Sequence, residues 1–201
     1  MGLQRVLSVR SADAVFPAAV LVVLTVTYLA GADAVAALRY ERLAVLQGEV
    51  WRLVTGHLVH ADAAHFGWNV VGVLLVGVLF ARDYSPAQWL VVMFASVVAI
   101  DLGFLLLEPR LEWYVGFSGV LHGWMAAGLV AWLHRSRDPL TWLVAALFVS
   151  KLAWEHYAGA LPFTAGSLSL PVVHEAHTYG AIGGLLAGVW LTRRTYVRAP
   201  L

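Results

Sequence analysis

The chain has 201 residues, of which 61% are hydrophobic and 12% are charged. An ordinary soluble domain carries about 25% charged residues, so this composition argues against a water-soluble fold. Cysteine is absent, which excludes a disulfide framework, a thiolate metal site and a cysteine nucleophile. The net charge of +1 and the lack of a basic cluster interleaved with aromatic residues give no reason to expect nucleic acid as a partner.

Six apolar windows are each long enough to cross a bilayer as a helix, which takes about 20 residues. They run approximately from Ala14 to Ala32, Ala63 to Ala81, Ala87 to Leu107, Trp113 to His134, Leu140 to Ala160 and Pro171 to Thr192. A more polar segment, Asp33 to Asp62, separates the first two windows. The windows predict an all-α membrane protein, one domain over residues 1–201 with six transmembrane helices.

The arginines predict the orientation of these helices, because cytoplasmic loops carry an excess of Arg and Lys. If both termini are cytoplasmic, the inner arginines are Arg5, Arg10, Arg82, Arg135, Arg137, Arg193, Arg194 and Arg198, and the outer ones are Arg39, Arg42, Arg52 and Arg110. Eight against four favours this orientation. The first window is longer than the usual core of a signal peptide, so we expect it to stay as a helix.

Polar residues are costly inside a membrane-spanning helix, so each one is a candidate functional residue. The windows contain His65, Asn69, Asp101, Ser118, His122, Lys151, Glu155, His156, His174 and His177. The second, fourth and sixth windows all run inward, and each has polar groups near its start. At about 1.5 Å per residue, His65, Asn69, Ser118 and His177 lie within about 11 Å of the outer boundary. The sequence therefore predicts a shared polar layer in the outer part of the bundle.

Small residues four positions apart allow two helices to approach closely in a membrane. Such residues are Gly119, Gly123 and Ala127 in the fourth window and Gly180, Gly184 and Gly188 in the sixth. If these two grooves face each other, Ser118 and His177 can approach hydrogen-bond distance. The alternative is that the glycines only pack helices and no chemistry is attached to them.

Ser118 and His177 are the candidate nucleophile and general base, because a serine hydroxyl needs a base and histidine titrates in the useful range. Attack on a carbonyl creates an oxyanion that needs hydrogen-bond donors. His65 and Asn69, at i and i+4 on one helix face, can offer side-chain N–H groups, and the backbone N–H of Ser118 is a third donor. Glu175 points to a different side of its helix from His177, so we expect a Ser-His dyad without a third member.

Three other polar residues have open roles. Lys151 is the only lysine, and we expect it to pair inside the bundle with Glu155 at i+4. Asp101 could orient the base or pair with Lys151. His122, one turn after the candidate nucleophile, is an alternative base.

Three motifs, in this order, resemble those of the rhomboid intramembrane proteases. Trp51-Arg52 and His65-Phe66-Gly67-Trp68-Asn69 resemble the family's Trp-Arg loop and HxxxN motif, Gly116-Phe117-Ser118-Gly119 resembles GxSG, and Ala176-His177-Thr178-Tyr179-Gly180, continuing to Gly184, resembles AHxxGxxxG. The resemblance implies an intramembrane serine endopeptidase without metal or cofactor. It would hydrolyse a peptide bond in or near a substrate's transmembrane segment, through an acyl-enzyme on Ser118.

Two departures from common rhomboids resemble the bacterial rhombosortase branch. They are Val120-Leu121-His122-Gly123, after the serine motif, and Lys151-Leu152-Ala153-Trp154-Glu155 in the fifth window. This resemblance implies an enzyme of the bacterial inner membrane whose substrates are exported proteins with a C-terminal Gly-Gly pair, a hydrophobic helix and a basic tail. Its active site would open to the external side. A general rhomboid protease acting on other single-span substrates is the alternative.

Two rival functions fit parts of the sequence. A metal-dependent membrane hydrolase could take ligands from His57, His60, His65, His174 and His177. The zincin pattern HExxH fails, however, because it needs a second histidine where Thr178 stands. An inactive rhomboid-like protein that binds client membrane proteins is expected to have lost the serine or the histidine, and both are present.

Overall fold

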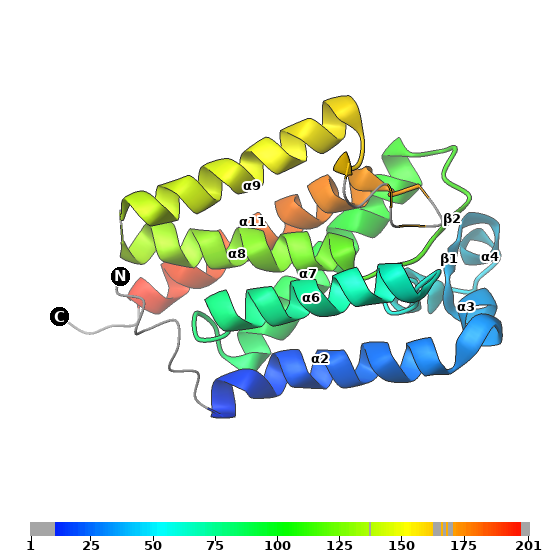
Figure 1. Ribbon diagram of the computed structural model, residues 1–201, viewed down its shortest axis with the longest axis horizontal. Helices are drawn as coiled ribbons and strands as arrows, with labels where there is room; N and C mark the ends of the chain where they lie inside the picture. The colour runs from blue at the N-terminus through cyan, green and yellow to red at the C-terminus, as the bar shows by residue number, and fades with distance from the viewer. Residues whose placement is uncertain (1–10, 137, 163–165, 167, 169–170, 198–201) are drawn as a thin grey trace.

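The structure is a computed structural model that describes residues 11–136, 138–162, 166, 168 and 171–197. Within these ranges six helices of 18 to 24 residues form a bundle (Figure 1). They are α2 (Ser11–Leu29), α6 (Ala63–Phe80), α7 (Pro86–Leu107), α8 (Ser118–Arg135), α9 (Pro139–Ala158) and α11 (His174–Val197). Each long helix overlaps one apolar window, and the predicted all-α class is confirmed.

The polar segment between the first two long helices folds into short elements. They are α3 (Gly31–Leu38), β1 (Tyr40–Glu41), α4 (Arg42–Leu46) and α5 (Arg52–Thr55). Buried Arg52 holds this segment together, because its guanidinium donates to the carbonyl oxygens of Ala36 at 3.0 Å and Arg39 at 2.9 Å. The first helix ends earlier than expected, since the chain bends by 109° between α2 and α3.

The helices alternate in direction along the bundle. In Figure 1, α6, α8 and α11 all begin at the end where β1 lies, and α2 begins and α11 ends at the opposite end. The first residues of α6, α8 and α11 therefore share one end of the molecule, as the predicted polar layer requires.

Capping residues determine where several helices begin and end. The side chain of Asp62 accepts the backbone N–H of His65 at 2.7 Å and so begins α6. Ser85 and Gln88 form a capping box at the start of α7. Gly159, with a φ of 78°, ends α9.

The expected start of the fourth helix at Trp113 is wrong. Trp113 and Tyr114 form the strand β2 (Trp113–Tyr114), which pairs antiparallel with β1 through Tyr40 and Glu41. Gly116 follows with a φ of 119°, a left-handed conformation that a right-handed helix cannot contain. Ser118 is consequently the first residue of α8 instead of lying inside a helix.

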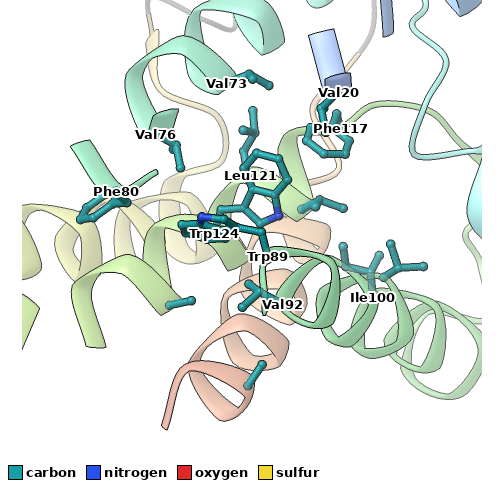
Figure 2. Close-up of a cluster of buried hydrophobic side chains, with 14 of the residues drawn as sticks. Val20, Val73, Val76, Phe80, Trp89, Val92, Ile100, Phe117, Leu121 and Trp124 are labelled. Carbon is teal, nitrogen blue, oxygen red and sulfur yellow. The ribbon is translucent and has the colours of Figure 1, made fainter. Parts of the chain in front are cut away.

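Aromatic and branched side chains fill the centre of the bundle (Figure 2). Trp124 of α8 is 2% exposed, with its ring centroid 5.6 Å from that of Trp89 and 5.4 Å from that of Phe117. Figure 2 shows Val73 and Val76 of α6 on one side of this cluster and Val92 of α7 on the other. These side chains pack α6 and α7 against α8.

Glycines bring α8 and α11 into backbone contact. A Cβ added at Gly180 would lie 2.0 Å from the carbonyl oxygen of Gly119, and one added at Gly184 would lie 2.0 Å from that of Gly123. No side chain fits at such distances, so glycine is required at both positions. The two small-residue grooves therefore face each other, which was the condition for Ser118 and His177 to meet.

The outer faces of the long helices expose large apolar side chains. Examples on three helices are Val22 (63% exposed), Phe94 (67%) and Leu147 (62%). Surfaces of this kind favour hydrocarbon over water. Among the described residues, α6 and α7 are long and apolar enough to cross a membrane, and the bent pair α2–α3 adds a third span if its two helices cross as one. That all six long helices cross stays a prediction.

The close contact of α8 and α11 predicts that a larger side chain between them lowers the stability of the protein. Gly184→Ala should destabilise the protein by about 1 to 3 kcal/mol, the usual cost of overpacking, and lower its midpoint of thermal unfolding in detergent. Gly67→Ala is the matched control, because a Cβ at Gly67 of α6 meets nothing within 4 Å. Circular dichroism melts of both variants in one detergent test this. Equal midpoints would contradict the required glycine contact.

Candidate active site

Ser118 and His177 come together at the end of the bundle where α6, α8 and α11 begin. The Oγ of Ser118 lies 2.9 Å from Nε2 of His177. The glycine contact positions them, because a Cβ at Gly119 would lie 2.9 Å from the carbonyl oxygen of Ala176. The two residues are thus neighbours of the point where the two backbones touch, and the sequence prediction of their proximity is confirmed.

The other ring nitrogen of His177 faces a carboxylate that we did not predict there. Its Nδ1 lies 2.9 Å from Oε2 of Glu155 on α9, and both residues are buried. From the sequence, Glu155 was expected to pair with Lys151 alone, and no third member was expected beside Ser118 and His177. The sequence did contain a signal for this contact. The fifth window runs outward and Glu155 lies near its end, which places Glu155 at the depth of the polar layer.

Lys151 connects this carboxylate to His122. Its Nζ lies 2.6 Å from Oε2 of Glu155, which confirms the expected pairing, and 2.7 Å from Nε2 of His122. The Nδ1 of His122 lies 2.7 Å from the main-chain oxygen of Ser118. Neither ring nitrogen of His122 is therefore placed on the serine hydroxyl. The rings of His122 and His177 are stacked, with centroids 4.0 Å apart and an interplanar angle of 15°.

Asp101 does not join this cluster. Its Oδ1 lies 3.4 Å from Nε2 of His57, so the predicted pairing with Lys151 and the predicted role of orienting His177 are both wrong. The reason is the order of the helices. The helix α7, which carries Asp101, packs against α5, and His57 lies two residues after the end of α5. Lys151, in contrast, lies on α9, which packs on α8 and α11.

His65 and Asn69 border the same site from α6. The loop before the serine lies directly against His65, because a Cβ at Gly116 would be 2.5 Å from its Nε2. Asn69 is buried, and its Nδ2 donates to the carbonyl oxygen of His65 at 2.8 Å, which uses one of its two N–H bonds. Desolvation lowers the pKa of the neighbouring His60 to about 3, so that ring is neutral at physiological pH.

Tyr114 fixes the loop that leads into the serine. Its hydroxyl donates to the carbonyl oxygen of Gly116 at 2.6 Å. The side chain is buried, and this burial raises the pKa of Tyr114, so the hydroxyl keeps its proton and remains a donor. The loop around Gly116 is therefore held from two sides, by Tyr114 and by His65.

A cavity of about 610 Å³ opens onto these groups. Its polar lining includes His65, Asn69, Ser118, His122, Lys151, Glu155 and His177. Apolar side chains line the rest, with Trp68 and Leu75 from α6, Met125 from α8 and Phe148 from α9. Such a cavity has room for an apolar peptide segment with one carbonyl at the polar end.

One group in the described part of the chain could gather a metal ion. The ligand atoms of His122, Glu155 and His177 all lie within 4.8 Å of one another. The ammonium of Lys151, however, lies 2.7 Å from His122 and 2.6 Å from Glu155, and its positive charge opposes a second cation there. Of the five histidines considered as ligands from the sequence, this group contains His177 alone.

Comparison with known proteins assigns the family. The profile of the Rhomboid domain matches residues 47–194. The chain belongs to the rhomboid family. Over 144 residues it is 28% identical to the provisionally named rhomboid protease YdcA of Bacillus subtilis (strain 168), a match that covers 72% of this chain and 68% of that protein. It is also 28% identical over 149 residues to Rhomboid-like protease 3 of Toxoplasma gondii, covering 71% of this chain and 51% of that protein.

A further rhomboid relative is matched over a shorter stretch. Rhomboid protease GluP of Bacillus subtilis (strain 168) is 28% identical over 87 residues, which are 43% of this chain and 17% of GluP. Rhomboid membership and the apolar helices together make this chain an integral membrane protein. Its class, by these relatives, is that of the intramembrane serine endopeptidases.

Proposed function

We propose that this rhomboid hydrolyses peptide bonds of transmembrane substrates by acyl transfer, with Ser118 as nucleophile and His177 as general base. The 2.9 Å contact between Ser118 Oγ and His177 Nε2, at the polar end of an apolar cavity, carries this proposal. His177 takes the hydroxyl proton as Oγ attacks the carbonyl carbon, and it returns that proton to the leaving amine. Water then attacks the acyl-enzyme in the same manner and regenerates Ser118.

His65, Asn69 and the backbone N–H of Ser118 are the proposed oxyanion donors. The first four N–H groups of a helix have no intrahelical partner, and Ser118 is the first residue of α8. His65 and Asn69 lie one turn apart on α6, facing the cavity that contains the serine. Donors fixed before the reaction stabilise charge at little reorganisation cost.

The proposed membrane arrangement has six spans and both termini in the cytoplasm of a bacterium, in the inner membrane. Two observations support it. The polar residues lie at the shared start of α6, α8 and α11, and Arg82, Arg135 and Arg193 lie near the ends of these helices, where cytoplasmic arginines are expected. The active site would then open to the external side.

The proposed substrates are exported proteins with a C-terminal Gly-Gly pair, a hydrophobic helix and a basic tail. A helical peptide bond is shielded by its own hydrogen bonds, so the substrate must unwind before Ser118 reaches a carbonyl, and unwinding is costly in lipid. Glycine lowers this cost, because it disfavours a helix by about 1 kcal/mol relative to alanine. The resemblance of His122, Lys151 and Glu155 to the rhombosortase branch supports the same assignment.

Removing the nucleophile or the base should abolish catalysis, because the two act as a unit. Ser118→Ala and His177→Ala should each show no cleavage and no labelling by a fluorophosphonate. Both variants should still be recovered as folded protein in detergent. His122→Ala tests the alternative base. Activity retained in His177→Ala but lost in His122→Ala would assign the base to His122. A wild type that neither labels nor cleaves would favour a client-binding protein.

Loss of an oxyanion donor should slow turnover without preventing it. His65→Ala and Asn69→Ala should each lower kcat by about ten- to a thousandfold, the range for losing one donor. Steady-state kinetics on a purified substrate measures this. Unchanged kcat in both variants would remove these residues from the site.

The Gly-Gly substrate is tested by co-expression with an exported reporter that carries such a tail. We expect a new C-terminus near the Gly-Gly pair, identified by its mass, and little cutting of a matched reporter with Leu-Leu in its place. Glycine favours the first reporter because its helix unwinds at a lower cost. Equal cutting of the two reporters would assign the chain to the general rhomboid proteases instead.

A further inference from the structure

The polar side chains around Ser118 form a closed circuit of hydrogen bonds. The serine hydroxyl contacts His177, His177 contacts Glu155, and Glu155 contacts Lys151. Lys151 then contacts His122, which returns to the main-chain oxygen of Ser118. Every contact in the circuit lies between 2.6 and 2.9 Å. The circuit therefore starts and ends at the residue proposed as nucleophile.

The chemistry of the groups gives each contact a direction. An ionised carboxylate can only accept, so Glu155 requires a proton on Nδ1 of His177. In the neutral ring, Nε2 is then the acceptor for the hydroxyl of Ser118. An ammonium can only donate, so Nε2 of His122 accepts from Lys151, and its Nδ1–H donates to the carbonyl oxygen of Ser118. Each contact in the circuit therefore joins one donor to one acceptor.

We infer that Glu155 is a positioning residue for His177, so that the site is a Ser-His-Glu triad in which Lys151 and His122 hold the carboxylate. This inference rests on the proposed function, because it concerns the same reaction. Glu155 selects the tautomer in which Nε2 can take the serine proton, and its negative charge faces the imidazolium that forms on His177.

The charges of the circuit balance in both states of the reaction. In the resting site the ammonium of Lys151 offsets the carboxylate of Glu155. In the tetrahedral intermediate a positive imidazolium and a negative oxyanion are added together. The sum stays zero, which matters because unpaired charge is costly in a site enclosed by apolar groups. Lys151 thus prevents Glu155 from standing as a lone buried carboxylate when His177 is neutral.

The ring of His122 restricts His177 from a second direction. The two rings are stacked at 4.0 Å and 15°, so His177 cannot rotate about its Cβ–Cγ bond without displacing His122. His122 is itself fixed at both ring nitrogens, by Lys151 and by Ser118. Glu155 and His122 therefore hold His177 through different contacts.

The test compares Glu155→Gln with Glu155→Asp. Lys151 and Nδ1 of His177 both contact Oε2 of Glu155, so a glutamine with its single oxygen at that position can still accept from both. The glutamine is neutral, however, and the imidazolium that forms on His177 loses the negative charge that faces it. We expect kcat of Glu155→Gln to fall by about 10²- to 10³-fold, the range for losing one fixed electrostatic contact to charge that develops in the reaction. KM should stay within about threefold, since substrate binding is not altered. Glu155→Asp, which keeps an acceptor-only carboxylate, should recover part of the lost kcat.

Glu175→Gln is the matched control. It makes the same chemical change two residues before His177, and its carboxylate contacts His174 and lies outside the circuit. Its kcat should equal that of the wild type. Thermal melts of all three variants separate a loss of chemistry from a loss of folded protein.

Proton NMR supplies a readout that does not depend on turnover. The Nδ1–H of His177, bonded to a carboxylate, should give a far-downfield resonance in the wild type and in Ser118→Ala. In Glu155→Gln this resonance should move clearly upfield, because a neutral amide oxygen is a weaker acceptor than a carboxylate. A folded Glu155→Gln protein with wild-type kcat, or one with the resonance at its wild-type position, would overturn the inference. If the wild type shows the resonance but neither labels nor cleaves, the proposed function fails while the position of Glu155 stands.

Discussion

The contact of α8 and α11 at their glycines is the constraint on which the active site depends. At Gly180 and Gly184 the backbone of α11 lies so close to α8 that no Cβ fits. This approach brings the first turn of α11 beside the start of α8, and with it His177 beside Ser118. In a membrane such packing relies on van der Waals contact between backbones, since lipid gives no hydrophobic drive for helices to associate. The close approach of the two backbones thus allows the 2.9 Å contact between the two side chains.

Close packing of the helices alone would leave the buried polar side chains beside Ser118 without hydrogen-bond partners. Lys151, Glu155 and His122 resolve this by satisfying one another and the serine main chain. A buried charge is tolerated when its partner and its remaining hydrogen bonds are in place, and removing one partner leaves an uncompensated charge. The hydrogen bonds that stabilise these buried charges also determine which ring nitrogen of each histidine carries the proton. Stability and the orientation of His177 are therefore linked in this part of the molecule, because both depend on the carboxylate of Glu155.

Hydropathy and residue depth predicted much of this from the sequence. The apolar windows located the six long helices to within a few residues, and the depth of Ser118 and His177 in inward-running helices predicted that they meet. The partner of Asp101 was missed because hydropathy does not say which helices are neighbours. Glu155 was missed for a related reason, since the rotation of α9 about its axis decides whether that side chain faces His177 or only Lys151. The left-handed conformation of Gly116 and the pairing of Trp113 with Glu41 were missed as well, because the hydropathy of a window does not show where its helix begins.

The corrected start of α8 changes the chemistry that the serine can perform. In an α-helix each N–H bonds to the carbonyl four residues earlier. Had the helix begun at Trp113, the N–H of Ser118 would have bonded to the carbonyl of Tyr114 and could not have served as an oxyanion donor. Because β2 and the left-handed Gly116 delay the helix until Ser118, that N–H belongs to the unpaired first turn. The positive end of the helix dipole then lies at the proposed nucleophile, where the proposed reaction develops negative charge on the substrate oxygen. A strand of two residues and one glycine conformation thus give the proposed nucleophile its backbone donor.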